Sequence, residues 1–583
     1  MSQRSSRDLA LLSVGLALLV GLILRLFHLD EQTFTHPEFY VPALHLPDFV
    51  VTPRARFTVP EVLREALLHD KHPPGYHILM LAWNLNVGTE VYAIRLSSVL
   101  FGMLALVAIP WFVRVNGGAG FGALAVWLLA LHGFQIFWSQ QARPWGLIGS
   151  LGIVTTAMLV SLVRRPRVAM LVGYGLIAGY GMWIDYYFWP IVCAQVLWVV
   201  LHELDRERPP LAFGAVALAA IIATPMAIYF WLHLTEQESH IRTAGWQDII
   251  RFLQFGGVVA AWKVRPLLGG FAAPFEILVA ALGALAIALG LRPWRVVQPA
   301  PPASRPYRSR TVFAILTFAA VAMSAWTWSA FHDLAGDRKI FRAALVAPFA
   351  VLAGLALVHG LWRSAAPALA GFRPIRWLRR VLADPVAAVP LAAFAGVMIV
   401  ATAKPLLAPY ALLCFTPFVV VLAARGIERM GRLRVPVATV VLAVFAASVW
   451  HYGTTRISSI EYKALGLQLA ERVSPGQAIV MRNNWATAPM NYYLPPDRFR
   501  IVPISHLPET RPPLRVALPD TLWLLAVGDD EAMLDVNLAD VERFVPGFRR
   551  DERLSTGSTA ALRVIRFDTP PPPDTSRPAP SAK

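Results

Sequence analysis

Cysteine is almost absent from this chain of 583 residues, which contains only Cys193 and Cys414. Two cysteines cannot build the disulfide framework of a small secreted module, and they do not have the spacing of a metal site. Both lie inside apolar runs, where a thiol packs as a small hydrophobic side chain. The sequence therefore excludes a disulfide-framed fold and offers no cysteine-based metal centre.

Charged residues are also scarce. They make up 15% of the chain, whereas soluble globular proteins carry roughly 25%. Hydrophobic residues make up 56%, they come in long blocks, and the mean hydropathy is +0.53. This composition excludes a disordered chain and an ordinary cytosolic enzyme, and it predicts a polytopic α-helical membrane protein.

The apolar blocks have the length of transmembrane helices, because a bilayer core of about 30 Å needs roughly 20 apolar residues per helix. The first block lacks a small-residue cleavage site, so we interpret it as an uncleaved first span rather than a signal peptide. Thirteen spans are predicted, near 9–27, 92–113, 119–138, 145–163, 168–187, 189–203, 210–233, 273–291, 311–332, 343–362, 385–403, 406–424 and 434–451.

Acidic residues are outnumbered, 36 against 53 Lys and Arg, which gives a net charge of +17. Such an excess first suggests nucleic acid. The arginines, however, gather in alternate loops between spans, for example at 164–167, 292–310, 363–380 and 425–434. This is the positive-inside pattern. It predicts a cytoplasmic N-terminus, a C-terminal region outside, and no nucleic-acid partner.

Between and after the spans the sequence predicts smaller parts. A transmembrane domain covers 1–456, with a first outer loop at 28–91 and a second at 234–272. Surface helices are predicted at Val59–His69 and His77–Leu85, and an amphipathic stretch at Trp246–Phe255. A small extracytoplasmic α/β domain follows at 457–568, with a helix at Tyr462–Val473 and strands at Ala478–Met481 and Leu522–Val527, before a Pro-rich tail at 569–583.

Residues suited to chemistry gather in the first outer loop. They include Asp30, Glu31, Arg54, Arg56, Asp70, Lys71 and His72. A carboxylate can accept a proton from an attacking hydroxyl, and cations can hold a phosphate leaving group. The alternative is a solvated loop whose charges lie at the membrane interface. The histidines lack a strong ligand spacing, which favours solvated or hydrogen-bonded side chains but leaves a divalent metal open.

Three further places stand out near span ends. Arg143, in the string Trp138-Ser139-Gln140-Gln141-Ala142-Arg143, either shapes a site or extends to the lipid headgroups. Asp185 and His240 are candidate site members that structural roles would equally explain.

Five strings along the chain resemble one family. Asp70-Lys71-His72-Pro73-Pro74-Gly75-Tyr76 is similar to the Asp-x-His-Pro-Pro-Leu-Tyr signature of bacterial family 39-like glycosyltransferases. Arg95 to Gly102 and Ser139 to Arg143 are similar to that family's Arg-Leu-Pro-Ser-x-Leu-Phe-Gly and Ser-Gln-Glu-Ala-Arg. Asp30-Glu31 matches its acidic pair, and Lys404 to Tyr410, continuing through Pro417, resembles the segment that usually contains Pro-Arg-Tyr.

The resemblance implies a GT-C membrane glycosyltransferase of the bacterial inner membrane, related to protein mannosyltransferases and the aminoarabinose transferase. Such an enzyme moves a sugar from a polyprenyl-phosphate donor to a lipid, glycan or protein acceptor, with inversion at the anomeric carbon. By motif position Asp30 is the general base with Glu31 beside it, Lys71 and His72 lie near the donor phosphate, and Arg143 shapes the pocket.

The chain also departs from the family pattern. Gln141 replaces a glutamate, Tyr410 replaces the arginine of Pro-Arg-Tyr unless Lys404 substitutes for it, and Gly75 replaces a leucine. These changes leave two other functions open. One is a transporter or flippase of lipid-linked glycans, although the sequence has no internal repeat and its charges lie at span ends. The other is a diverged, non-catalytic assembly subunit.

Overall fold

The structure is a computed structural model of the whole chain. It describes residues 3–31, 38, 58–62, 72–118, 120–203, 211–233, 243–258, 269–291, 309–331, 342, 345–354, 382, 384–403, 411–455, 462–474, 477–481, 500–503, 521–527, 549–559 and 562–568.

The chain divides into two compact units. Unit 1 comprises Met1–Leu29 and Thr58–Thr455, and unit 2 comprises Asp30–Phe57 and Arg456–Lys583. The chain therefore passes from unit 1 to unit 2 between Leu29 and Asp30 and returns after Phe57.

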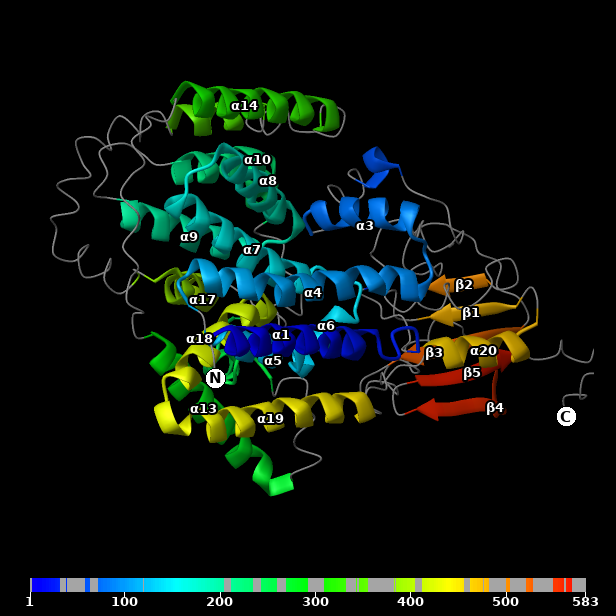
Figure 1. The fold of residues 1–583 in the computed structure, drawn as a ribbon. Helices are drawn as coiled ribbons and strands as arrows, with labels where there is room; N and C mark the ends of the chain where they lie inside the picture. The colour runs from blue at the N-terminus through cyan, green and yellow to red at the C-terminus, as the bar shows by residue number, and fades with distance from the viewer. Residues whose placement is uncertain are drawn as a thin grey trace, which may run out of the picture. The chain divides into compact units, whose positions relative to one another are not determined.

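Unit 1 is built from apolar helices (Figure 1). The helices are α1 (Gln3–Leu26), α3 (Gly75–Asn86), α4 (Val91–Val115), α5 (Gly122–Ala130), α6 (Gly133–Ser139), α7 (Trp145–Arg164), α8 (Val168–Ile184), α9 (Phe188–Glu203), α10 (Leu211–His233), α11 (Trp246–Leu253), α13 (Ala272–Leu291), α14 (Ser309–Phe331), α17 (Pro385–Ala403), α18 (Thr416–Glu428) and α19 (Arg434–Thr455). Short 3₁₀ turns occur at η2 (Gly269–Phe271), η3 (Ala411–Cys414) and η4 (Gly431–Leu433).

The membrane character predicted from composition is confirmed. Within the described residues, seven helices are long and apolar enough to cross a membrane, or eight if the bent pair α5 and α6 forms one span. Each of the thirteen predicted spans contains helical residues, but α8, α9 and the helix at Leu345–Gly354 are shorter than a full span, and α18 begins ten residues after the predicted span does. The exact number of spans stays a prediction.

One predicted span is broken. The run at 119–138 forms α5 and α6, whose axes differ by 61°. His132 lies at the break and its Nδ1 accepts the backbone N–H of Gln135, so it caps α6. The Arg25 guanidinium donates to the carbonyls of Leu129 and Ala130, which end α5. Backbone groups on both sides of the break are therefore bonded by side chains inside the protein, as buried backbone requires.

Small residues let some helices pack closely against each other. A Cβ at Gly175 or Gly179 of α8 would lie 2.5–2.7 Å from side-chain atoms of Leu218 or Ile222 on α10. This spacing, with two glycines one turn apart on one face, is how membrane helices approach closely. It positions α8, whose end carries part of the candidate site.

Unit 2 contains a mixed sheet and helix α20 (Tyr462–Arg472). Its strands are β1 (Ala478–Met481), β2 (Arg500–Pro503), β3 (Thr521–Val527), β4 (Arg549–Thr559) and β5 (Leu562–Asp568). They lie in the order β2-β1-β3-β5-β4, with β1 parallel to β2 and β3 and the other pairs antiparallel. The predicted helix and the two predicted strands coincide with α20, β1 and β3.

Candidate functional site

The structure describes five of the predicted site residues. Asp30 and Glu31 are exposed on the turn that follows α1, at the start of unit 2. His72, Gln141 and Arg143 belong to unit 1. The other predicted site residues lie outside the described residues, namely Arg54, Arg56, Asp70, Lys71, Lys404 and Tyr410, as does the candidate His240.

His72 is held by the contact between the start of α3 and the end of α8. Pro73 and Pro74 lead into α3, and Pro74 is its N-cap. Gly75 follows, and a Cβ there would lie 2.6 Å from the carbonyl carbon and oxygen of Trp183. The Tyr180 hydroxyl donates to the Gly75 carbonyl over 2.8 Å. The residue that departs from the family's leucine is thus the one that lets the two backbones touch.

Asp185 lies between α8 and α9, two residues after Trp183. It is 3% exposed, and its Oδ1 accepts the backbone N–H of Tyr187 over 2.8 Å. Aspartate commonly bonds a backbone N–H two residues ahead and so stabilises a turn. This bond fixes the carboxylate at the end of α8.

Arg143 comes from a third turn, between α6 and α7. This turn is formed by a bond of 2.7 Å from the backbone N–H of Arg143 to the carbonyl of Gln141. Trp145, the first residue of α7, is buried and its ring lies 5.9 Å from that of Tyr187, centroid to centroid. The aromatic contact places the Arg143 turn next to the Asp185 turn.

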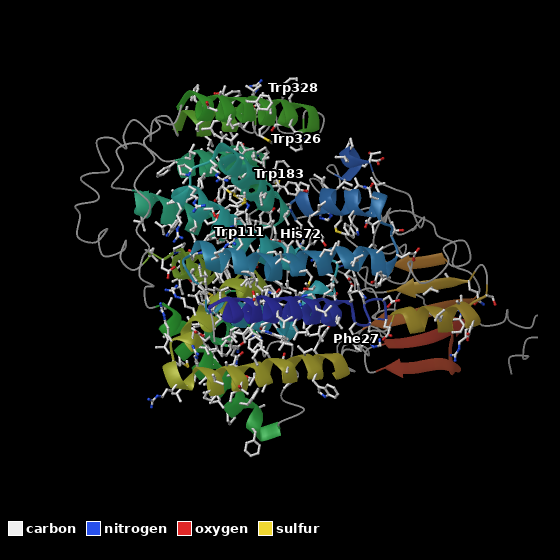
Figure 2. All side chains as sticks on the ribbon, viewed as in Figure 1. Phe27, His72, Trp111, Trp183, Trp326 and Trp328 are labelled. Atoms are coloured by element: carbon white, nitrogen blue, oxygen red, sulfur yellow. The ribbon has the colours of Figure 1, made fainter. Side chains whose placement is uncertain are left out.

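The three turns bring His72, Arg143 and Asp185 together. Burial raises the pKa of Asp185 to about 6, and the Tyr187 N–H and the charges of His72 and Arg143 partly oppose that rise. His72 and Arg143 were predicted as site residues, and Asp185 was a candidate. Figure 2 labels His72 and also Trp183, which lies near the end of α8. The cluster offers a carboxylate and two nitrogen bases or cations, a set that can bind a phosphate or move a proton.

This cluster also bears on one departure from the family pattern. Gln141 is buried, 4% exposed, and contributes no carboxylate. The carboxylate whose charge interacts with Arg143 comes instead from Asp185, which lies on a different turn. A carboxylate near Arg143 is therefore present although the motif's own glutamate is missing.

Sequence reasoning missed three residues that shape this end of unit 1. They are Arg95, Gln140 and Tyr452, which bond to the end of α1 or to one another. Arg95 and Gln140 lie inside the motif strings, so their presence there was the available signal. Tyr452 carried no signal, because it is a single residue just after the predicted span at 434–451 and belongs to no motif string. Among the described residues, no group of three or more His, Cys, Asp and Glu side chains could hold a metal ion.

No protein-family model and no curated protein matches this sequence. Several solved structures resemble it. ArnT from Cupriavidus metallidurans bound to undecaprenyl phosphate has 13% identity and a TM-score of 0.40, over 96% of this chain and 98% of that chain. The Archaeoglobus fulgidus oligosaccharyltransferase complex with zinc and sulfate has 12% identity and a TM-score of 0.42, over 94% and 73%.

A third structure is the arabinofuranosyltransferase AftD from mycobacteria, with 12% identity and a TM-score of 0.39, over 98% of this chain and 42% of that chain.

Proposed function

We propose that this chain is an integral-membrane glycosyltransferase. It moves a sugar from a polyprenyl-phosphate donor to a lipid, glycan or protein acceptor on the extracytoplasmic face of the bacterial inner membrane. The observation that carries the proposal is the meeting of His72, Arg143 and Asp185, because two separate motif strings and a third turn supply one ionisable cluster.

The cluster suits the leaving group of this reaction. The donor sugar is joined to the lipid through a phosphate diester. When the bond to the anomeric carbon breaks, the lipid phosphate leaves with the electron pair and gains one negative charge. Arg143 and His72 offer hydrogen-bond donors to that charge, and Lys71 adds to them by its motif position. Asp185 then acts as a positioning residue, since its charge interacts with both side chains.

Asp30 is the general base in this mechanism. Its carboxylate accepts the proton of the acceptor hydroxyl while the hydroxyl oxygen attacks the anomeric carbon from the side opposite the phosphate. The new glycosidic bond forms as the carbon–phosphate oxygen bond breaks, so the anomeric configuration inverts. Glu31 lies next to Asp30 in the sequence and supports the same step.

Sugar transfer in purified membranes tests the proposal. A panel of polyprenyl-phosphate sugars is offered, and transfer from at least one of them is expected. Asp30→Asn abolishes transfer while the protein still inserts and folds. Arg143→Ala raises the KM for the donor by about tenfold or more, as the loss of one charge-assisted hydrogen bond predicts.

Two results would contradict the proposal. Full activity of Asp30→Asn would remove Asp30 from its role. Movement of a lipid-linked glycan across the membrane without any transfer would favour the transporter or flippase instead.

A further inference from the structure

The end of α1 is held by side chains that come from other helices. The last carbonyls of any helix lack partners within the helix and must find them elsewhere. Here the Gln140 side chain donates its Nε2 to the carbonyls of Leu24, Arg25 and Phe27, over 3.2, 3.0 and 3.1 Å. One buried amide therefore bonds three carbonyls at the C-terminal end of α1.

Gln140 is itself held from the opposite side. Its Oε1 accepts the hydroxyl of Tyr452, on α19, over 2.9 Å. Gln140 is 1% exposed and Tyr452 is 7% exposed. Because both ends of the amide are bonded, the side chain has one orientation. It therefore links α19 to the end of α1 through two sets of hydrogen bonds.

The chain then leaves α1 in a constrained conformation. His28 has φ of 51°, a left-handed backbone that usually ends helices at glycine. Leu29 follows, 1% exposed, and its carbonyl accepts Nη1 of the fully buried Arg95 over 2.9 Å. The next residue in the chain is Asp30.

A deeper anchor supports the same helix. Fully buried Arg25 donates to Ser139 Oγ over 3.3 Å and to the carbonyls of Leu129 and Ala130 at the break of the bent span. Ser139 and Gln140 are neighbours in the motif string that also contains Arg143. The string thus has two functions, since one part holds α1 and the other contributes to the His72 cluster.

We propose that Gln140 and Arg95 are positioning residues, which fix the point where the chain leaves α1 and thereby the place of Asp30 and Glu31. The inference rests on the proposed function for its effect on transfer. Its structural part, an ordered turn at residues 30 and 31, can be measured without any substrate.

The chain offers a matched control for Gln140. Gln195 on α9 is also fully buried, and its Oε1 accepts the hydroxyl of Tyr174 over 2.7 Å. Its Nε2 donates to the hydroxyls of Thr155 and Thr156, within the contact of α7, α8 and α9. The two glutamines have the same burial and the same kind of tyrosine partner, but only Gln140 bonds to α1.

The experiment uses the full chain in lipid nanodiscs, with a nitroxide label on Glu31→Cys in a Cys193→Ser background; Cys414 is buried. Gln140→Met and Gln195→Met each remove one amide and keep the length of the side chain. We expect the label to become more mobile in Gln140→Met and to stay unchanged in Gln195→Met. Equal mobility in the two variants would overturn the proposal.

Transfer by the unlabelled chains gives the second measurement. Gln140→Met is expected to lower kcat by about tenfold to a hundredfold with little change in the donor KM, as misplacement of a reacting group does. Gln195→Met keeps its kcat. A loss of kcat without a change in label mobility would overturn the positioning role and leave the proposed function standing. A more mobile label in Gln140→Met, together with no sugar transfer by the unsubstituted chain, would overturn the proposed function and leave the positioning role standing.

A second pair of variants covers the case in which Gln140→Met does not fold. Tyr452→Phe removes the bond that orients Gln140, whereas Tyr174→Phe removes the equivalent bond of Gln195. Of this pair, we expect a more mobile label in Tyr452→Phe and an unchanged label in Tyr174→Phe. Arg95→Lys should also make the label more mobile, because lysine lacks the guanidinium Nη1 that donates to the Leu29 carbonyl.

Discussion

The two ends of unit 1 use their charges differently. At one end, called the Arg425 end, Arg425 of α18 forms a salt bridge with Asp384, which precedes α17. Arg429 at the same end donates to the carbonyls of Leu289 and Gly290, over 2.7 and 3.3 Å, where α13 ends. At the other, the His72 end, Asp185 lies among His72 and Arg143 and its pKa is raised. Helix α4 runs from Arg95 at the His72 end toward Gly120, which neighbours Glu428.

This contrast distinguishes charges that stabilise the fold from charges that we expect to act in the reaction. Charges at the Arg425 end have fixed partners, a carboxylate or the carbonyls of a helix terminus, and such partners stabilise helix ends. At the His72 end a carboxylate is buried although burial disfavours its charged form, and perturbed groups of this kind are typical of functional sites. Substitutions at the Arg425 end should therefore change stability, and those at the His72 end should change transfer.

The largest effect is expected at the buried salt bridge. Asp384→Asn leaves Arg425, whose side chain is 2% exposed, without its carboxylate. The free energy of unfolding should fall by about 3–5 kcal/mol. Reversible unfolding in mixed micelles measures it, and kcat per folded molecule should be unchanged. A normal stability together with a loss of kcat would break the contrast between the two ends.

A smaller effect, which depends on pH, is expected at Asp185. Because its folded pKa is about 6 rather than 3.8, the folded state keeps a proton that the unfolded state releases. The free energy of unfolding should therefore fall by about 3 kcal/mol as pH rises from about 4 to about 6. The groups near the carboxylate are His72, Arg143, the Tyr187 N–H and the buried Cys414.

Asp185→Asn removes this pH dependence, and unfolding curves at pH 4, 5, 6 and 7 measure the change. The variant should lose the fall in stability across that range. Its donor KM should rise, since neither His72 nor Arg143 then has the carboxylate beside it. An unchanged KM would leave Asp185 with a structural role only.

The next effect is expected at Gly75. Gly75→Leu restores the residue typical of the family, yet a Cβ there collides with the Trp183 backbone. Overpacking of this kind lowers stability by about 1–3 kcal/mol. It should also separate His72 from Asp185, so the donor KM should rise. Gly15→Leu is the control, because no atom lies within 4 Å of its Cβ position.

The smallest effect is expected at the exposed pair of the Arg425 end. Arg434 Nη1 lies 3.0 Å from Glu428 Oε1, with the two side chains 55% and 31% exposed. Glu428→Gln should change the free energy of unfolding by less than about 1 kcal/mol, because solvent screens the pair. A larger loss would mean that exposed pairs matter here as much as the buried one.

The fold was largely predictable because its signals are local. The long apolar runs correspond to the apolar helices of unit 1, the amphipathic stretch at Trp246 to α11, and the change of composition near residue 457 to the start of unit 2's helix and sheet. The break of the third span was not predictable, since its cause is a capping histidine and an arginine, Arg25, that lies over a hundred residues away. Strands β2, β4 and β5 were also missed.

The candidate site was predictable only in part. His72 and Arg143 were found through motif strings, and Asp185 was found only as a polar residue among aromatic ones. Gly75 was noted as a departure from a pattern, whereas its contact with Trp183 explains why glycine is needed here. Contacts between turns from different helices depend on how the helices pack, and a motif records only residues close in sequence.

The sequence by itself determined that this chain is a hydrophobic, basic membrane protein, because hydrophobic length and charge are local properties. Which charges face one another was decided only by the tertiary structure. The contact between α3 and α8 brings His72 to Asp185, and Gln140 joins α1 to α19. Burial then raises the pKa of Asp185, an effect of surroundings that no single segment contains.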